Sequence, residues 1–106
     1  MAVIESLGDR RSRASALGDI ARLRAQKGEV GAALALHQER LATHEALGDR
    51  RSRAITLGDI ARLRAQKGEV DAALALQQEA LATCEALGDR RGRAVTLSDI
   101  ARLRAA

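Results

Sequence analysis

Apolar residues recur three or four positions apart over most of the chain, which is the spacing of one face of an α-helix. One such stretch follows Asp49 and contains Ala54, Leu57, Ile60, Ala61 and Leu63. Lys67 and Gly68 come next, and a cation in the last turn followed by glycine is a typical helix end. The pattern predicts a helix that has Asp49 as its N-cap and ends before Gly68.

A second helix is predicted from Glu69-Val70 to Gly88, because apolar residues again keep helical spacing. Its apolar positions are Val70, Ala73, Leu74, Ala80, Leu81, Cys84 and Leu87. Leu57-Gly58-Asp59 copies the Leu-Gly-Asp turn found ten residues earlier, so a break in the first helix there is an alternative. The corresponding position in the third copy is Ser98, which favours a continuous helix with a small residue facing a neighbour.

The whole pattern repeats every 40 residues. Residues 7–46 and 47–86 are two full copies, which differ only at Ser15/Ile55, Ala16/Thr56, Gly31/Asp71, His37/Gln77, Arg40/Ala80 and His44/Cys84. Residues 87–106 form half of a third copy, and residues 1–6 align with the end of a preceding second helix. A fixed period of this length predicts one all-α domain over residues 1–106, a solenoid of stacked antiparallel helix pairs with about 2.5 repeats.

Composition narrows the choice of function. The chain has no aromatic residue, so it lacks the stacking platforms of single-strand nucleic-acid binders. Its one cysteine excludes an internal disulfide and a multi-cysteine metal site. There is no signal-peptide apolar region and no apolar run of about 20 residues, so a cytoplasmic protein without a membrane segment is expected.

The pattern resembles the tetratricopeptide repeat (TPR), in a 40-residue form that ends in Leu-Gly-Asp-Arg-Arg. In the second copy Leu57, Gly68, Ala73 and Ala80 match positions of the family pattern, and Ile60-Ala61 replace its Leu-Gly. Arg64 and Gln77 stand where the family has aromatic residues, and Arg40 replaces a small residue in the first copy. The resemblance covers essentially the whole chain and implies right-handed stacking of the helix pairs.

The resemblance also implies a binding surface, because the first helices of TPR arrays line a concave groove. On this chain the corresponding residues are Asp19, Arg22, Gln26, Asp59, Arg62, Gln66, Asp99 and Arg102. The expected function is therefore a protein–protein interaction scaffold that binds a peptide or helix in this groove. The simpler interpretation is that each Asp/Arg pair is a solvated intrahelical ion pair worth only about 0.3–0.5 kcal/mol.

Other chemistry is less well supported by the sequence. Arginine clusters recur at residues 10–13, 50–53 and 90–93 and would form a basic ridge for a polyanion, although neighbouring acids can pair with them. His37 and His44 are about 10.5 Å apart along a helix and cannot share a metal ion directly. Cys84 has no oriented base, so we expect no enzyme activity, and neither a cofactor nor a metal.

The two ends of the array suggest a second function, self-assembly. Leu97, Ile100, Ala101 and Leu103 have no following second helix to cover them, and Val3 and Ile4 only partly cover the other end. Burial of these faces between copies predicts a homo-oligomer. The near-identity of the copies fits recent duplication, consensus design or a fragment of a longer array.

Overall fold

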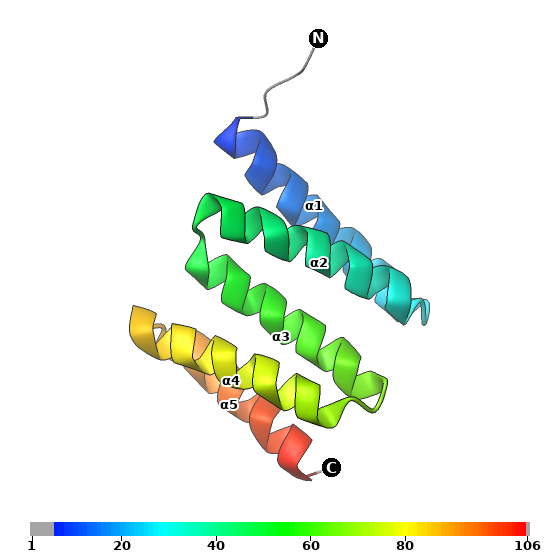
Figure 1. Ribbon diagram of the computed structural model, residues 1–106, viewed down its shortest axis with the longest axis vertical. Coiled ribbons are helices and arrows are strands. Elements are labelled where there is room, and N and C mark those ends of the chain that lie inside the picture. Colours follow the sequence, from blue (N-terminus) through cyan, green and yellow to red (C-terminus); the bar gives the residue numbers. More distant parts are fainter. Residues whose placement is uncertain (1–5, 106) are drawn as a thin grey trace. The chain divides into compact units, whose positions relative to one another are not determined.

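The computed structural model describes residues 6–105, and these residues form five α-helices and no β-strand. The prediction of an all-α chain is thus confirmed. The chain divides into two compact units, residues up to Asp49 and residues from Arg50 onward. The first unit contains α1 (Leu7–Gln26) and α2 (Val30–Leu47), and the second contains α3 (Arg50–Gln66), α4 (Val70–Leu87) and α5 (Arg90–Ala105), as labelled in Figure 1.

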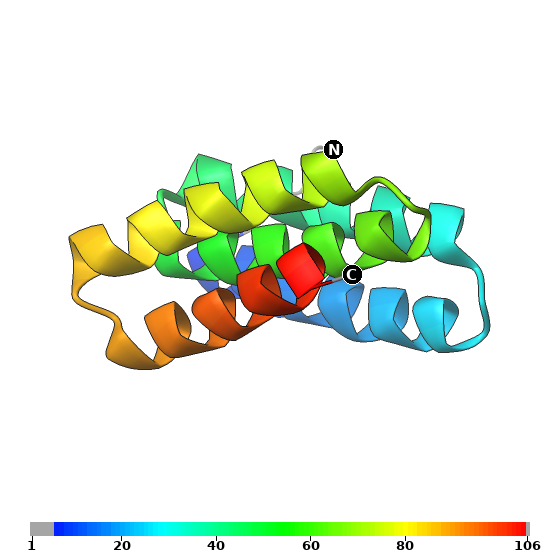
Figure 2. The same ribbon diagram turned by 90° about the horizontal axis from the view of Figure 1, so that it is seen from below.

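Within each unit, consecutive helices are joined by short turns and pack side by side (Figure 2). Gly28 and Gly68 follow the first helix of each full repeat and have positive φ angles of 82° and 85°. Gly48 and Gly88 end α2 and α4 in the left-handed conformation, where a residue without Cβ is favoured. The helix ends predicted at Gly68 and Gly88 are therefore confirmed.

The helix starts differ between the repeats. Asp89 accepts a hydrogen bond from the Gly92 amide at 3.0 Å, which is the capping role predicted for the aspartate before each first helix. In the first repeat α1 begins earlier, because Ser6 is its N-cap and Asp9 lies inside the helix as the partner in a capping box. The counterpart of Ser6 in the next repeat is Ala46, which has no side-chain acceptor and lies inside α2.

The helix through Leu57-Gly58-Asp59 is continuous, as predicted, because α3 runs without a break from Arg50 to Gln66. Gly18 and Gly58 adopt ordinary helical angles and are both buried. An added Cβ on Gly18 would lie 3.0 Å from the Arg40 guanidinium carbon, and one on Gly58 would lie 3.8 Å from the Gln77 amide oxygen. The glycine therefore allows a close approach between the first and second helices.

The core of each unit is built from alanine and branched aliphatic residues. Ala14, Ala21, Ala33 and Leu34 are buried in the first unit. The second unit has a larger apolar core, made by Ala54, Leu57, Ile60, Ala61, Leu63, Ala73, Ala80, Cys84 and Ile100. The third helix of this unit, α5, packs mainly on α4.

Candidate functional site

The predicted groove residues of the first unit lie on the exposed surface of α1. Arg22 pairs with Asp19 at 3.0 Å within the helix, and both side chains are largely exposed. Gln26 lies at the end of α1, beside a shallow hollow lined by Ile20 and Leu23. In this unit the Asp/Arg pair has the geometry of a solvated intrahelical ion pair.

The second unit brings four of the predicted groove residues together in one network. Arg62 pairs with Asp59 in its own helix at 2.9 Å and with Asp99 of α5 at 2.6 Å. Arg102 completes the network at 3.3 Å from the other Asp99 oxygen. The network joins α3 to α5, whereas Gln66 is exposed at the end of α3 and does not take part.

Asp99 is the centre of this network and is buried, with its side chain 8% exposed. Besides the two arginines, it accepts a hydrogen bond from the Gln77 side-chain amide of α4 at 3.3 Å. A buried carboxylate with three donors holds α3, α4 and α5 together. Asp99 is therefore a structural anchor of the surface rather than a freely accessible contact.

A hollow of about 210 Å³ lies between α3 and α5, on one side of the Arg62–Asp99 pair. Ile55 of α3, Val95 of α5 and Leu87 of α4 contribute apolar side chains to it, and they are 51%, 48% and 44% exposed. A smaller hollow of about 150 Å³ lies on the other side of the pair, beside Arg102 and Leu103. We call the larger one the α3–α5 groove.

The floor of the groove is polar and tightly packed. Gln77 and Cys84 of α4 and Thr96 of α5 line it. An added Cβ on Gly92 would lie 2.8 Å from the Cys84 sulfur, so glycine lets the start of α5 approach α4. Burial, reinforced by the nearby Asp89 carboxylate, raises the pKa of the Cys84 thiol, which keeps it protonated and unreactive.

The residues predicted from the sequence to contact a partner do not include the apolar groove residues Ile55, Leu87 and Val95. One signal for two of them was available, because the position occupied by Ser15 in the first repeat carries a β-branched apolar residue in the other two. An apolar residue that replaces serine on an exposed helix face indicates a specialised surface. No such signal marked Leu87, which repeats Leu47 unchanged.

Acidic residues within the same unit neutralise several arginines of the recurring clusters. Arg13 pairs with Glu39 in the first unit, and Arg53 pairs with the equivalent Glu79 at 2.9 Å in the second. Arg51 lies 3.4 Å from the Asp89 carboxylate, and so links one repeat to the next. These pairs weaken the case for a continuous basic ridge.

The apparent metal-ligand candidates of the first unit are buried polar residues of α2. His37 and His44 are both buried, and the Arg40 guanidinium lies 3.4 Å from the His37 ring. Neither ring nitrogen of His44 has a hydrogen-bond partner among residues 6–105. Burial, with a smaller effect of the nearby Arg40 charge, lowers the pKa of His44, although Asp49 partly opposes this shift.

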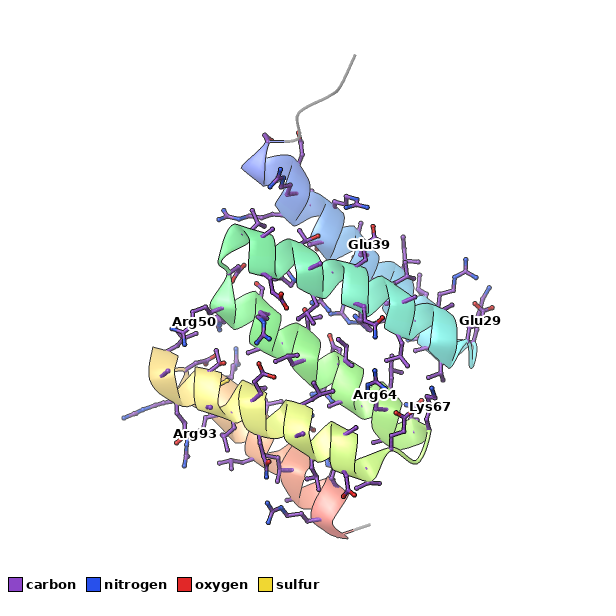
Figure 3. The ribbon with its side chains drawn as sticks, viewed as in Figure 1. Glu29, Glu39, Arg50, Arg64, Lys67 and Arg93 are labelled. Atoms are coloured by element: carbon purple, nitrogen blue, oxygen red, sulfur yellow. The ribbon has the colours of Figure 1, made fainter. Side chains whose placement is uncertain are left out.

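A charged cluster also marks the turn between α3 and α4, where Arg64 and Lys67 lie close together (Figure 3). Both side chains pair with Glu69, at 2.8 and 3.2 Å. Hydrogen bonds from Arg64 and then Lys67 lower the pKa of this half-buried carboxylate. The first unit repeats the Arg24–Glu29 pair at 2.8 Å, so the cluster belongs to the repeat and fixes its turn.

The residues predicted for self-association separate into three groups. Leu97 and Ala101 are exposed, and Leu103 is half-buried. Ile100 is buried, 8% exposed, and therefore belongs to the core of the second unit. Val3 and Ile4 lie outside the described residues.

Comparison with known proteins gives no identification: no model of a known protein family matches the chain, and no curated protein matches it at a significant level. None of the described helices is both long enough and apolar enough to span a membrane.

Proposed function

We propose that the protein is a TPR-like repeat scaffold that binds an extended peptide or a short helix in the α3–α5 groove. The observation that carries this proposal is the apolar hollow between two successive first helices, lined by Ile55, Leu87 and Val95. Concave apolar surfaces with a few convergent polar groups are the usual form of a binding site. The repeat period and the short helix pairs support stacking of the repeats into a solenoid.

The rim of the groove indicates the chemistry of the partner. Arg51, Arg62 and Arg91 line the hollow, whereas the Asp89 and Asp99 carboxylates beside it are mostly buried. Arg51 and Arg62 pair with these buried carboxylates but stay largely exposed, so further guanidinium N–H groups can donate to a ligand. A rim of such arginines beside the apolar side chains of the groove favours a peptide with an apolar anchor and flanking carboxylates. We therefore expect an acidic, leucine- or isoleucine-containing peptide to bind best.

The test is a selection from a random peptide display library on the immobilised chain. Ile55→Ser and Val95→Ser supply a matched control, because serine occupies the same position in the first repeat. Peptides selected by the unchanged chain should bind the double variant at least about tenfold more weakly, since two apolar contacts worth about 1 kcal/mol each are lost. Helicity should be unchanged, because both side chains are half exposed.

The result that would contradict this function is equally specific. If the selected peptides bind the double variant as well as the unchanged chain, the α3–α5 groove is not the binding site. Enrichment of basic rather than acidic sequences would contradict the proposed role of the arginine rim.

Self-assembly is the second candidate function, favoured by the exposure of Leu97, which is 37% exposed on α5. Sedimentation over a range of concentrations, followed by interference optics, distinguishes the two candidates. A mass that rises with concentration, and returns to that of a monomer in Leu97→Glu, would support self-assembly. A monomer at every concentration would exclude it.

A further inference from the structure

The same three-residue stripe occurs on the first helix of every repeat. It consists of Ala-Leu-Ala at helical spacing, namely Ala14, Leu17 and Ala21 in α1, Ala54, Leu57 and Ala61 in α3, and Ala94, Leu97 and Ala101 in α5. Residues three and then four positions apart lie on one side of a helix. The stripe is therefore a single, repeated packing surface.

In both complete repeats a second helix covers this stripe. In the first unit α2 packs on α1, and Ala14 and Ala21 are buried. In the second unit α4 packs on α3, and Leu57 is only 2% exposed. On α5 the same residue types are all exposed, including Leu97, so no helix of the described chain covers them.

The charges beside the stripe point to the same occupant. In each complete repeat an arginine just before the stripe pairs with a glutamate of the second helix, as Arg53 does with Glu79 at 2.9 Å. A second arginine beyond the stripe pairs with the glutamate that precedes the second helix, as Arg64 does with Glu69 at 2.8 Å. Arg93 and Arg104 hold these two positions on α5. Arg93 lies 3.8 Å from Glu85 of α4 in a half-exposed pair, and a docked second helix would bring the matching glutamates beside both arginines.

We infer that the stripe on α5, Ala94, Leu97 and Ala101, is a docking surface for a helix with the sequence pattern of α4, supplied by a partner protein rather than by a second copy of this chain. The small alanines allow close helix approach, Leu97 provides the apolar anchor, and the arginines set the direction of the docked helix. This surface goes beyond the proposed peptide groove, which is lined by other α5 residues, among them Val95 and Asp99.

The fold also predicts which second helix α5 accepts. Arg40 of α2 fills the space beside Gly18, where even a Cβ would lie 3.0 Å from the guanidinium carbon. The corresponding position of α5 is Ser98, whose side chain would take up that space in a docked complex, and the corresponding residue of α4 is the small Ala80. We therefore expect α5 to accept a helix like α4 and to reject one like α2.

The experiment measures binding of labelled synthetic peptides to the full chain by fluorescence anisotropy under reducing conditions. The probes are residues 69–88, which carry α4, residues 29–48, which carry α2, and a scrambled 69–88 peptide. The 69–88 peptide should bind saturably and about tenfold more tightly than the 29–48 peptide, since the arginine of the 29–48 peptide would overpack the space beside Ser98. The scrambled peptide should not bind.

Variants of the chain identify the surface. Leu97→Glu should abolish binding of the 69–88 peptide, and Ala101→Glu should do the same without removing a partly packed leucine. Val95→Ser, which weakens the peptide groove, should leave this binding unchanged, so failure of one site is distinguishable from failure of the other. Ser98→Gly should strengthen binding of the 29–48 peptide.

Three outcomes would overturn the inference. First, the 69–88 peptide does not bind. Second, it binds the Ala101→Glu variant as well as the unchanged chain, which would mean that the peptide displaces α4 from its own unit. Third, the chain alone dimerises and the Ala101→Glu substitution makes it monomeric, which would identify a second copy as the occupant of the stripe.

Discussion

The helices α2 and α4 have nearly the same sequence but use it to build different interiors. They differ at Gly31/Asp71, His37/Gln77, Arg40/Ala80 and His44/Cys84, and the last three pairs are all buried. The first unit therefore encloses two imidazoles and a guanidinium, whereas the second encloses an amide, a methyl group and a thiol. One repeat framework therefore tolerates either a charged or a nearly neutral interior.

The largest effect is expected when the second unit receives the basic residue of the first. Ala80 is 2% exposed, so Ala80→Arg forces a charged side chain into a packed interior. We expect the free energy of unfolding of the second unit to fall by roughly 3 kcal/mol. Hydrogen exchange of α3–α5, read by mass spectrometry, measures this loss.

The matched control is Ala82→Arg in the same helix, because Ala82 is exposed and this variant should change stability little. Equal effects of the two variants would show that the second unit accommodates an arginine as the first does. The contrast between the two interiors would then lose its physical basis.

The next largest effect is expected from the Asp/Arg pair of the second unit, which should contribute more to stability than the pair of the first unit. Asp99→Asn removes the buried carboxylate that Arg62, Arg102 and Gln77 contact, and should destabilise the second unit by about 2 kcal/mol. Asp19→Asn in the first unit should cost less than about 0.5 kcal/mol, because its pair is solvated. Chemical unfolding followed by circular dichroism gives both values, and similar losses would refute the assigned difference in burial.

Acidification should affect the first unit more than the second. The pKa of His44 is lowered from its ordinary value of 6.5 in the folded chain, chiefly by burial. The unfolded chain therefore binds a proton more readily, and stability falls as the pH drops below about 6.5 toward the folded pKa. Hydrogen exchange of α1–α2 at pH 7 and pH 5, corrected for the intrinsic rates, should show this loss of protection.

His44→Cys, which installs the residue of the second repeat, provides the control for the pH prediction. This variant should remove most of the extra sensitivity of the first unit between pH 7 and pH 5. Unchanged sensitivity would assign the effect to other titrating groups.

The smallest expected effect concerns the buried glycines. Gly58→Ala should stabilise α3 by about 0.5–1 kcal/mol, because its new Cβ meets only the Gln77 oxygen at 3.8 Å. Gly18→Ala should give less or none of this gain, because Arg40 lies 3.0 Å from the same point. Thermal unfolding compares the two variants, and an equal gain would show that Arg40 moves aside freely.

Most of the helical architecture could be predicted from local sequence signals. The period of 40 residues, the apolar spacing and the terminal glycines located both helices of each repeat, and Ser98 correctly indicated the continuous helix through Gly58. The start of α1 was missed because Ser6 caps it in place of Asp9. Which residue serves as the N-cap depends on where the preceding segment stops being helical, and the alignment of repeats does not show that position.

The candidate site was predictable only in part. Helical spacing paired each aspartate with its own arginine, but the bridge from Arg62 to Asp99 depends on the packing of α5 beside α3. Burial of Ile100 likewise follows from the side of α5 that packs on α4. The resemblance implies contacts only at polar and charged positions, so it does not predict the apolar groove residues, of which Ile55 and Val95 differ from the first repeat.

The most direct test of peptide binding by the second unit is methyl-resolved NMR of isoleucine, leucine and valine during titration with a selected acidic peptide. The proposed function predicts shifts of the Ile55, Leu87 and Val95 methyl signals, with Ile20 and Leu23 of the first unit unchanged. Shifts confined to Ile20 and Leu23, or to Leu97, would place the binding surface elsewhere and contradict the proposed function.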